Sequence, residues 1–380
     1  MVWVSLSGTP TTNDDLKHLQ QFDQLQELEL ERTAIDDAGL QHLSCLARLQ
    51  ILNLSYTKCG GNGLGAISSL PKLTQLRMWH TPLSTAGVRR IAELFNLLEL
   101  DLTGAKSVCD GDLEYLPRLT KLRRLKLSQT SITDAAFEHI GKIGTLESLD
   151  VFDIRALTGA SLRPLKTLKC LESLGHPLHS TTAADLECLT ACANLHILNA
   201  SSNYLSDGDL EGLRHLTQLR DLHLSGLRVT DAGLRSLTAL TKLESLHLSL
   251  GRITDNGLRY IADLTSLRSL VLLDTFSDTG FVSLKNLKHL RKLEIGTKRV
   301  TSAGVSQLAN LTELKRLYLR HHRMTDDHIE LLRNSTKLEE LVLFNATLTE
   351  KGFQRLQTFS ELQTLLLDEA TIPSLSLIHI

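Results

Sequence analysis

Leucines recur along the chain at a nearly constant spacing and define a repeated unit. Segments of the L-x-x-L-x-L type begin at residues 25, 49, 73, 97, 122, 146, 171, 195, 219, 243, 267, 290, 314, 338 and 362. Eleven of the fourteen intervals are 24 residues, two are 25 and one is 23. Met1, Val4 and Leu6 fit the same register, so the chain holds about sixteen copies, the last one incomplete.

The pattern inside each copy predicts a short strand followed by a helical return. We number the positions of each copy as slots, starting from the leucine that opens L-x-x-L-x-L. Leucines in the fourth and sixth slots alternate with polar residues, which is the period of a strand with one buried face. Successive strands are expected to stack in parallel about 4.8 Å apart. Leu234, Leu237 and Leu240 are spaced by three, which predicts a short α or 3₁₀ stretch packed against the strands. No copy can bury its apolar face alone, so the chain is a one-dimensional stack.

Two polar positions in the unit have predictable roles. A hydrogen-bonding side chain follows most strands and is expected to satisfy backbone groups where the chain turns inward, as at Thr33, Thr57, Thr81, Thr130 and Asn203. Further on, Thr-Asp or Ser-Asp precedes Gly-Leu. We expect the aspartate, as at Asp231, to cap the following helical turn.

The repeated unit resembles the leucine-rich repeat family. Its Thr-Asp-Ala-Gly-Leu motif, seen at residues 230–234, is most similar to bacterial leucine-rich repeat proteins and to the repeats of F-box adaptor and ribonuclease-inhibitor-like proteins. The resemblance covers about residues 1–374 and implies an α/β solenoid, a curved horseshoe with parallel strands on the concave face and short α or 3₁₀ segments on the convex face. It also implies partner binding through the concave face, and it transfers no catalytic residue. The family's usual Asn appears only at Asn203, and the prevailing Thr fits the bacterial subtype.

Both ends of the chain interrupt the expected pattern of a complete solenoid. Solenoids carry terminal caps with a polar outer face, and residues 1–374 show none, so we interpret the chain as a fragment of a longer protein. Residues 375–380 fall outside the register, and one back-translation of them matches the transposase end sequence of sequencing adapters. We interpret them as an adapter-derived tail, with an ordinary Leu-Ser-rich tail as the alternative.

Composition and charge narrow the classes of partner. The 84 leucines, compared with sixteen aromatic residues, agree with a small leucine core that is repeated in every copy. With 41 Lys+Arg and 43 Asp+Glu, the net charge of −2 lacks the basic footprint of nucleic-acid or membrane-surface binding, so we expect neither partner. Six cysteines in no framework spacing predict scattered thiols and favour a cytoplasmic location. Cys188 and Cys192 lack the partners of a zinc site.

Aromatic and apolar residues on the concave side are the candidate binding residues. The second, third, fifth, seventh and eighth slots face that side, where such residues are expected to have no packing role. Exposed aromatic and Arg clusters are typical binding anchors. The early patch comprises Tyr56, Arg77, Trp79 and His80; Phe152 stands apart; the late patch comprises Val271, Leu273, Tyr318, Arg320, Val342 and Phe344. Scattered surface residues are the alternative interpretation.

The sequence contains residue groups that resemble catalytic or metal sites, and we expect neither kind. Asp221, His223 and Ser225 alternate along one strand, but alternate residues lie about 6.6 Å apart and no oxyanion donors accompany them. His223 and His247 could share a metal with His196, yet no carboxylate or thiol in neighbouring slots completes a ligand set. Phosphate-loop, dinucleotide and H-E-x-x-H motifs are absent from the sequence, so we expect no cofactor.

Copies seven and eight break the pattern. Thr is replaced at Ile154 and His179, and Gly175, His176 and Pro177 replace the strand signature. Proline inside a ladder removes a donor. This break is either an insertion that shapes a ligand site or a kink where two blocks of repeats meet.

These features predict a non-enzymatic protein-interaction scaffold that binds a protein or peptide partner on its concave face. The first alternative is the substrate-recognition part of an F-box-type ubiquitin-ligase adaptor. The second is the recognition arm of a larger bacterial enzyme or effector.

Overall fold

Two compact units make up the chain. The computed structural model describes residues 2–201, 205–226, 228–249, 251–273, 276–296, 300–320, 324–344 and 346–368. Unit 1 comprises residues 1–178 and 188–195, and unit 2 comprises residues 179–187 and 196–380. Asn203 and the suspected tail at residues 375–380 lie outside the described residues.

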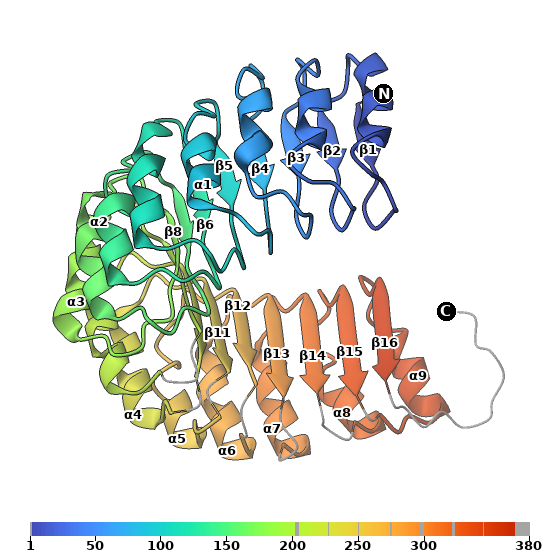
Figure 1. Ribbon diagram of the computed structural model, residues 1–380. Coiled ribbons are helices and arrows are strands. Elements are labelled where there is room, and N and C mark those ends of the chain that lie inside the picture. Colours follow the sequence, from blue (N-terminus) through green and yellow to red (C-terminus); the bar gives the residue numbers. More distant parts are fainter. Residues whose placement is uncertain are drawn as a thin grey trace. The chain divides into compact units, whose positions relative to one another are not determined.

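In unit 1, short parallel strands follow one another in chain order, with helical segments between them (Figure 1). The described strands are β1 (Trp3–Ser5), β2 (Glu27–Glu29), β3 (Ile51–Asn53), β4 (Gln75–Arg77), β5 (Glu99–Asp101), β6 (Arg124–Lys126), β7 (Ser148–Asp150) and β8 (Ser173–Gly175). The helical segments are η1 (Asp15–Gln21), η2 (Gly39–Leu43), η3 (Asn62–Ile67), α1 (Thr85–Ile91), η4 (Asp110–Arg118), η5 (Asp134–Ala136), α2 (Phe137–Ile140), η6 (Gly159–Thr167) and η7 (Cys188–Ala191), where η marks a 3₁₀ helix.

Unit 2 repeats this arrangement with longer strands. Its described strands are β9 (Ile197–Ser201), β10 (Asp221–Ser225), β11 (Ser245–Ser249), β12 (Ser269–Leu272), β13 (Lys292–Gly296), β14 (Arg316–Arg320), β15 (Glu340–Phe344) and β16 (Thr364–Asp368). Its helical segments are α3 (Ala183–Glu187), η8 (Gly208–His215), α4 (Asp231–Leu234), η9 (Arg235–Ala239), α5 (Asp255–Leu258), α6 (Asp278–Phe281), η10 (Val282–Asn286), α7 (Ser302–Gln307), η11 (Leu308–Asn310), α8 (Asp326–Leu331) and α9 (Glu350–Leu356).

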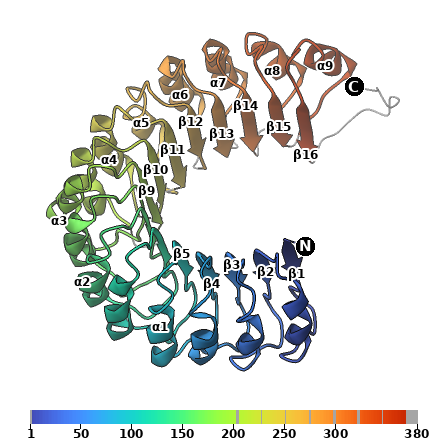
Figure 2. The ribbon, with the colours of Figure 1, turned by 90° about the horizontal axis from the view of Figure 1, so that it is seen from above.

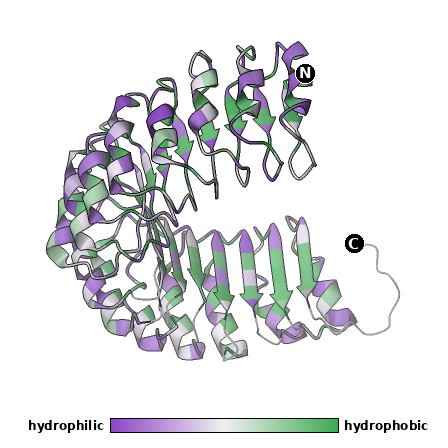
Figure 3. Ribbon diagram, in the orientation of Figure 1, coloured by the Kyte–Doolittle hydropathy of each residue, from purple (hydrophilic) through white to green (hydrophobic). Residues whose placement is uncertain are grey.

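Leucines hold the strand layer and the helical layer of each unit together. In Figure 2 the strands of each unit line one side and the helical segments the other. Leu222 pairs with Leu198 and Leu246 on the neighbouring strands and is fully buried. Figure 3 shows mostly hydrophobic strands beside helical segments of mixed hydropathy. The predicted repeat of a parallel strand and a short helical return is confirmed.

Threonines after the strands have the predicted role. The hydroxyl of Thr33 donates to the carbonyl of Leu30 over 2.7 Å, and that of Thr57 donates to the carbonyl of Leu54 over 2.6 Å. Thr81 and Thr130 make the same bond to the residue three positions earlier. These side chains are buried, so each one satisfies a carbonyl that water does not reach.

The predicted capping role of Asp231 is wrong. Thr230 is the N-cap of α4, and its hydroxyl accepts a hydrogen bond from the amide of Ala232. Asp231 is the first helical residue, and its carboxylate instead reaches the next repeat. There it accepts from the amide of Thr254 over 2.8 Å and from the Thr254 hydroxyl over 2.6 Å.

This bond between repeats recurs, and we call it the Asp–Thr tie. In each case a carboxylate accepts from the backbone amide and the hydroxyl of a Thr or Ser in the following repeat. The described ties are Asp110–Thr133, Asp134–Thr158, Asp207–Thr230, Asp231–Thr254, Asp255–Ser277, Asp278–Thr301 and Asp326–Thr349.

At the break in the pattern, His176 is a fully buried residue of unit 1. Its Nε2 lies 2.8 Å from the hydroxyl of Ser161, and its Nδ1 accepts from the amide of Leu178 over 3.0 Å. Its ring meets the edge of Phe137, with ring centroids 6.1 Å apart. A histidine therefore fills a leucine slot with its polar atoms bonded. The first boundary between the units falls just after Leu178, so the break in the pattern coincides with it.

Removing one Asp–Thr tie is expected to destabilise unit 2. Asp231→Ala deletes two hydrogen bonds to Thr254, and we expect the free energy of unfolding to fall by roughly 1 to 2 kcal/mol. Urea denaturation followed by circular dichroism measures the change. Asp263→Ala removes an exposed carboxylate outside the ties and serves as the control. Equal effects of the two substitutions would show that the tie contributes nothing.

A tie is also expected to make stability depend on pH. Burial opposes ionisation of Asp255, but hydrogen bonds from Ser277, Thr279 and Gly280 outweigh it and lower the pKa of this carboxyl group. Its contribution to stability is therefore present above the unfolded pKa of about 4 and is lost as pH falls through the folded pKa. We expect Asp255→Asn to lose less stability than the wild type between pH 6 and pH 3. Urea midpoints across that range test this, with Asp263→Asn as the control.

Candidate functional site

The eighth slot of unit 1 adopts a left-handed backbone that extends the strand ladder. The φ angles are 54° at Arg32, 56° at Tyr56 and 49° at His80, a region uncommon for residues other than glycine. The amide of Tyr56 donates to the carbonyl of Trp79 over 2.7 Å. The amide of His80 donates in the same way to the carbonyl of Thr103 over 2.9 Å. Inter-repeat hydrogen bonds hold this conformation, and each repeat places its eighth side chain beside that of the next repeat.

Three of these side chains form a stack, which we call the aromatic column. The rings of Tyr56 and His80 stack with centroids 4.7 Å apart and an interplanar angle of 28°. The guanidinium carbon of Arg32 lies 4.7 Å from the centre of the Tyr56 ring, a cation–π distance. His80 lies close against Gly104, where an added Cβ would come within 2.3 Å of the imidazole. A larger residue at Gly104 would therefore force the imidazole of His80 to shift.

The early patch is brought together in part. Tyr56 and His80 are in contact, and Tyr56 and Trp79 are 39% and 36% exposed. Arg77 forms an ion pair with Glu29 instead, with its Nη1 3.3 Å from a carboxylate oxygen. The sequence analysis did not single out Arg32.

Phe152 has a packing role that the sequence analysis did not expect. An added Cβ at Gly175 would lie 2.6 Å from Cε2 of Phe152, so the ring covers the neighbouring strand. The side chain is half-buried. The expectation that Phe152 has no packing role is wrong, and its part in binding stays a prediction.

Two members of the late patch are buried. Val271 and Val342 are each 6% exposed, so the expectation that they lie bare on the strand face is wrong. Each occupies a fifth slot between paired strands: Val271 lies between His247 and Glu294 in the register, and Val342 between Tyr318 and Leu366. Side chains on neighbouring strands lie close enough to cover a short valine. Leu273 stays 39% exposed, and Leu366, which the sequence analysis did not select, is 49% exposed.

The rest of the late patch is held by charged neighbours. Arg320 Nε lies 2.6 Å from a carboxylate oxygen of Glu294, and its guanidinium carbon is 5.3 Å from the centre of the Phe344 ring. The Tyr318 hydroxyl donates to Glu340 over 2.7 Å. Burial, followed by this carboxylate, raises the pKa of Tyr318 to about 12. The phenol is therefore protonated at neutral pH and has its donor engaged.

The polar residues on β10 and β11 form a histidine pair. His223 Nε2 lies 3.1 Å from Asp221 Oδ1, and the rings of His223 and His247 stack with centroids 5.2 Å apart. Ser225 lies two residues beyond His223 on β10, and in the register it pairs with Ser201 and Ser249 on the neighbouring strands. Within the described parts of the chain, no three His, Cys, Asp or Glu side chains are grouped to hold a metal.

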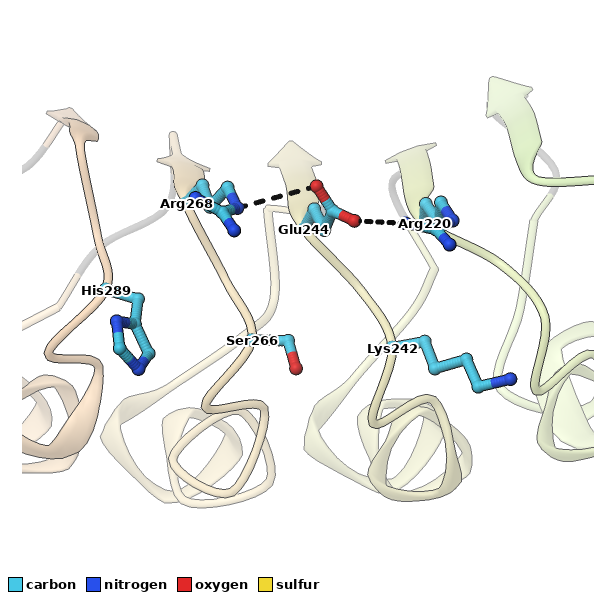
Figure 4. Close-up of a pocket in the computed structure, with 6 residues that line it drawn as sticks. All are labelled: Arg220, Lys242, Glu244, Ser266, Arg268 and His289. Carbon is cyan, nitrogen blue, oxygen red and sulfur yellow. Dashed lines mark hydrogen bonds and ion pairs between the residues drawn. The ribbon is translucent and has the colours of Figure 1, made fainter.

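A basic cavity at the strand-entry edge of unit 2 was missed by the sequence analysis. It encloses about 330 Å³, and its lining residues come from the second slot and from the residue just before the first slot (Figure 4): Arg220, Lys242, Glu244, Ser266, Arg268 and His289. A cavity of about 390 Å³ occupies the same place in the repeats of unit 1: Gln50, Pro71, Lys72, Thr74, Asn96, Leu98 and Lys121 line it. Aligning the second slots down the stack would have revealed Arg220 and Arg268, and aligning the position before the first slot would have revealed Lys242.

Comparison with known proteins now supports the family. Residues 85–326, more than half of the chain, match the family described as leucine-rich repeat region. The chain belongs to the leucine-rich repeat family. No curated protein matches it.

Solved structures of other leucine-rich repeat proteins share the fold. A leucine-rich repeat protein of Leptospira interrogans is 18% identical, with a TM-score of 0.59, 96% of this chain covered and 89% of that one. TLR13, solved in complex with ssRNA13, is 19% identical, with a TM-score of 0.68, 93% of this chain covered and 57% of that one. At these identities the likeness shows the fold alone. Among the described residues, no helix has the length and apolar character needed to cross a bilayer.

The histidine pair predicts a depressed pKa at His247. Burial and then the neighbouring His223 lower the pKa of His247, against the opposing influence of Glu294 and Asp221 and together with Lys292. Because the folded pKa lies below the unfolded value of about 6.5, stability falls as pH drops from the unfolded pKa through the folded one.

NMR titration of the imidazole is the measurement. We expect the His247 pKa to lie below 6.5 and to rise toward it in His223→Gln, because one neighbouring positive charge is removed. His42→Gln in unit 1 should leave the His247 titration unchanged. A wild-type value at or above 6.5 would contradict the prediction.

Proposed function

We propose that this leucine-rich repeat protein is a non-enzymatic interaction scaffold that binds a protein or peptide partner through the side chains of its strand face. The observation that carries the proposal is the aromatic column of Arg32, Tyr56 and His80, adjacent in the repeat to the exposed Trp79. Tyr, Trp and Arg are the residue types that dominate binding energy in protein interfaces. On this strand face they are not needed to bury the leucine core.

Preorganisation supports the early patch as the main anchor. The Tyr56 ring lies between Arg32 and His80, so its rotamer is restricted before any partner arrives. Ordering a side chain on binding costs roughly 0.5 to 1.5 kcal/mol, and a side chain already ordered avoids most of that cost.

The late patch is proposed as a second contact area in unit 2. Tyr318, Arg320 and Phe344 are fixed by Glu340 and Glu294 and by the stacking of Arg320 over Phe344. The exposed Leu273 and Leu366 add apolar surface on the same strand face. The buried Val271 and Val342 would act from beneath, by holding these neighbours in place.

The charge balance and the thiols support the proposed partner class and location. A net charge of −2 favours a protein over a nucleic acid as the partner, although TLR13 was solved with RNA. Six free cysteines, including Cys59, whose burial raises its pKa to about 12, agree with a reducing cytoplasm. Two alternatives use this same surface within a longer protein. In one, a chain with ribonuclease-inhibitor-like repeats recognises the substrate of an F-box-type ubiquitin-ligase adaptor; in the other, it is the recognition arm of a larger bacterial enzyme or effector. The full reading frame of the gene distinguishes them.

The test is selection of peptides from a displayed library on the purified chain, followed by affinity measurement for the selected sequences. We expect Tyr56→Ala with Trp79→Ala to weaken binding by about 30-fold or more, because two anchors are lost. Phe95→Ala removes an aromatic side chain that is 57% exposed outside the strand face, and it should change affinity less than twofold.

A triple variant tests the late patch separately. Tyr318, Arg320 and Phe344 are replaced together by alanine, and circular dichroism verifies that each variant folds. Unchanged binding by this triple variant excludes the late patch. Unchanged binding by both sets of variants overturns the proposal.

A further inference from the structure

The strand-entry edge of unit 2 carries a basic surface separate from the strand-face patches. Figure 4 shows Arg220, Glu244 and Arg268 side by side, each just before the first residue of β10, β11 and β12, with Lys242, Ser266 and His289 in the loops that lead into β11, β12 and β13. These six residues line a cavity of about 330 Å³, which we call the basic edge.

Contacts within the basic edge leave positive charge uncompensated. Glu244 is shared, with one carboxylate oxygen 2.5 Å from Arg220 Nη1 and the other 3.5 Å from Arg268 Nε. Lys242 is exposed and forms no ion pair with any acidic residue among those described. Three cationic side chains therefore line the cavity against one carboxylate, with His289 counted as neutral.

Positive charge continues along the next rung of the ladder. The amide of Arg268 donates to the carbonyl of Glu244, and the amide of Arg291 donates to the carbonyl of Arg268, each over 2.7 Å. Arg268 and Arg291 therefore stand on adjacent rungs about 4.8 Å apart. Like charges directly opposite each other on paired strands are destabilising. An anionic partner laid across these rungs would relieve that repulsion.

We infer that the basic edge binds an acidic segment of the protein partner, one that carries several Asp or Glu side chains. The inference rests on the proposed protein-binding function and adds the charge of the partner. Guanidinium groups pair with carboxylates through two parallel hydrogen bonds, and Lys242 adds a compact charge beside them. Glu244 holds Arg220 and Arg268 on either side of it, within reach of a further carboxylate supplied by the partner.

The lining favours an acidic peptide over a nucleic acid. Binding of single-stranded nucleic acid combines a basic groove with aromatic side chains on which bases stack. Among the six lining residues the only ring is the imidazole of His289, and Glu244 would repel a continuous phosphate backbone.

Fluorescence anisotropy with a fluorescein-labelled hexaglutamate peptide tests the inference on the full chain at low salt. We expect saturable binding that weakens as salt is added. Lys242→Gln with Arg268→Gln should weaken it roughly tenfold, since exposed charge pairs contribute up to about a factor of five each.

The matching cavity of unit 1 supplies the control. Lys72→Gln with Lys121→Gln removes the same number of charges from the lining of that cavity and should change affinity less than twofold. All four residues are exposed lysines or arginines, so both double variants are expected to fold, which circular dichroism verifies.

Three outcomes would overturn the inference. They are absence of hexaglutamate binding, equal weakening by the two double variants, and equal or tighter binding of a labelled hexauridylate that the Lys242 and Arg268 substitutions abolish. If library-selected peptides still depend on Tyr56 and Trp79 in any of these cases, the proposed function stands and only the acidic-segment inference fails.

Discussion

The one-to-one pairing of each strand with the next is the constraint on which everything else in each unit depends. His223 pairs with His247 and Leu222 with Leu246, so residues 24 apart occupy neighbouring rungs. A residue type repeated at one slot therefore becomes a continuous column with a spacing of about 4.8 Å. Leucine columns give a core that no single repeat could bury, and the remaining slots become surfaces whose chemistry is set column by column.

This geometry explains why the proposed binding residues are arranged in stacks from repeat to repeat. Arg32, Tyr56 and His80 meet because they share the eighth slot, and Arg220, Glu244 and Arg268 meet because they share the second. A spacing of about 4.8 Å lies within the range of centroid distances in offset-stacked rings, so flat side chains in neighbouring repeats can stack. The strand face and the strand-entry edge therefore present different chemistry.

The sequence was sufficient for the repeat, the parallel strands, the helical returns and the threonine bonds, because each depends only on positions within one unit or one register. It was not sufficient where a neighbour decides the outcome. The pattern predicts that Val342 is exposed on the strand face, yet it is buried and lies between Tyr318 and Leu366 of the neighbouring strands. The pattern predicts that Asp231 caps its own helix, yet its carboxylate oxygens accept hydrogen bonds from Thr254 of the following repeat. The side chain that covers or bonds a residue is fixed by contacts across rungs, which a pattern within one copy does not contain.

The Asp–Thr tie has a consequence for how such a chain can change in length. Each tie is made from the aspartate of one repeat and the Thr or Ser of the next. Four described repeats carry both halves in adjacent positions: Thr133–Asp134, Thr230–Asp231, Thr254–Asp255 and Ser277–Asp278. Duplicating or deleting one of these four units as a whole therefore leaves each carboxylate facing a hydroxyl, whereas gaining or losing a single residue separates a donor from its acceptor. A gain or loss of one of these units keeps the hydrogen bonds of the Asp–Thr tie intact at the new junction between repeats.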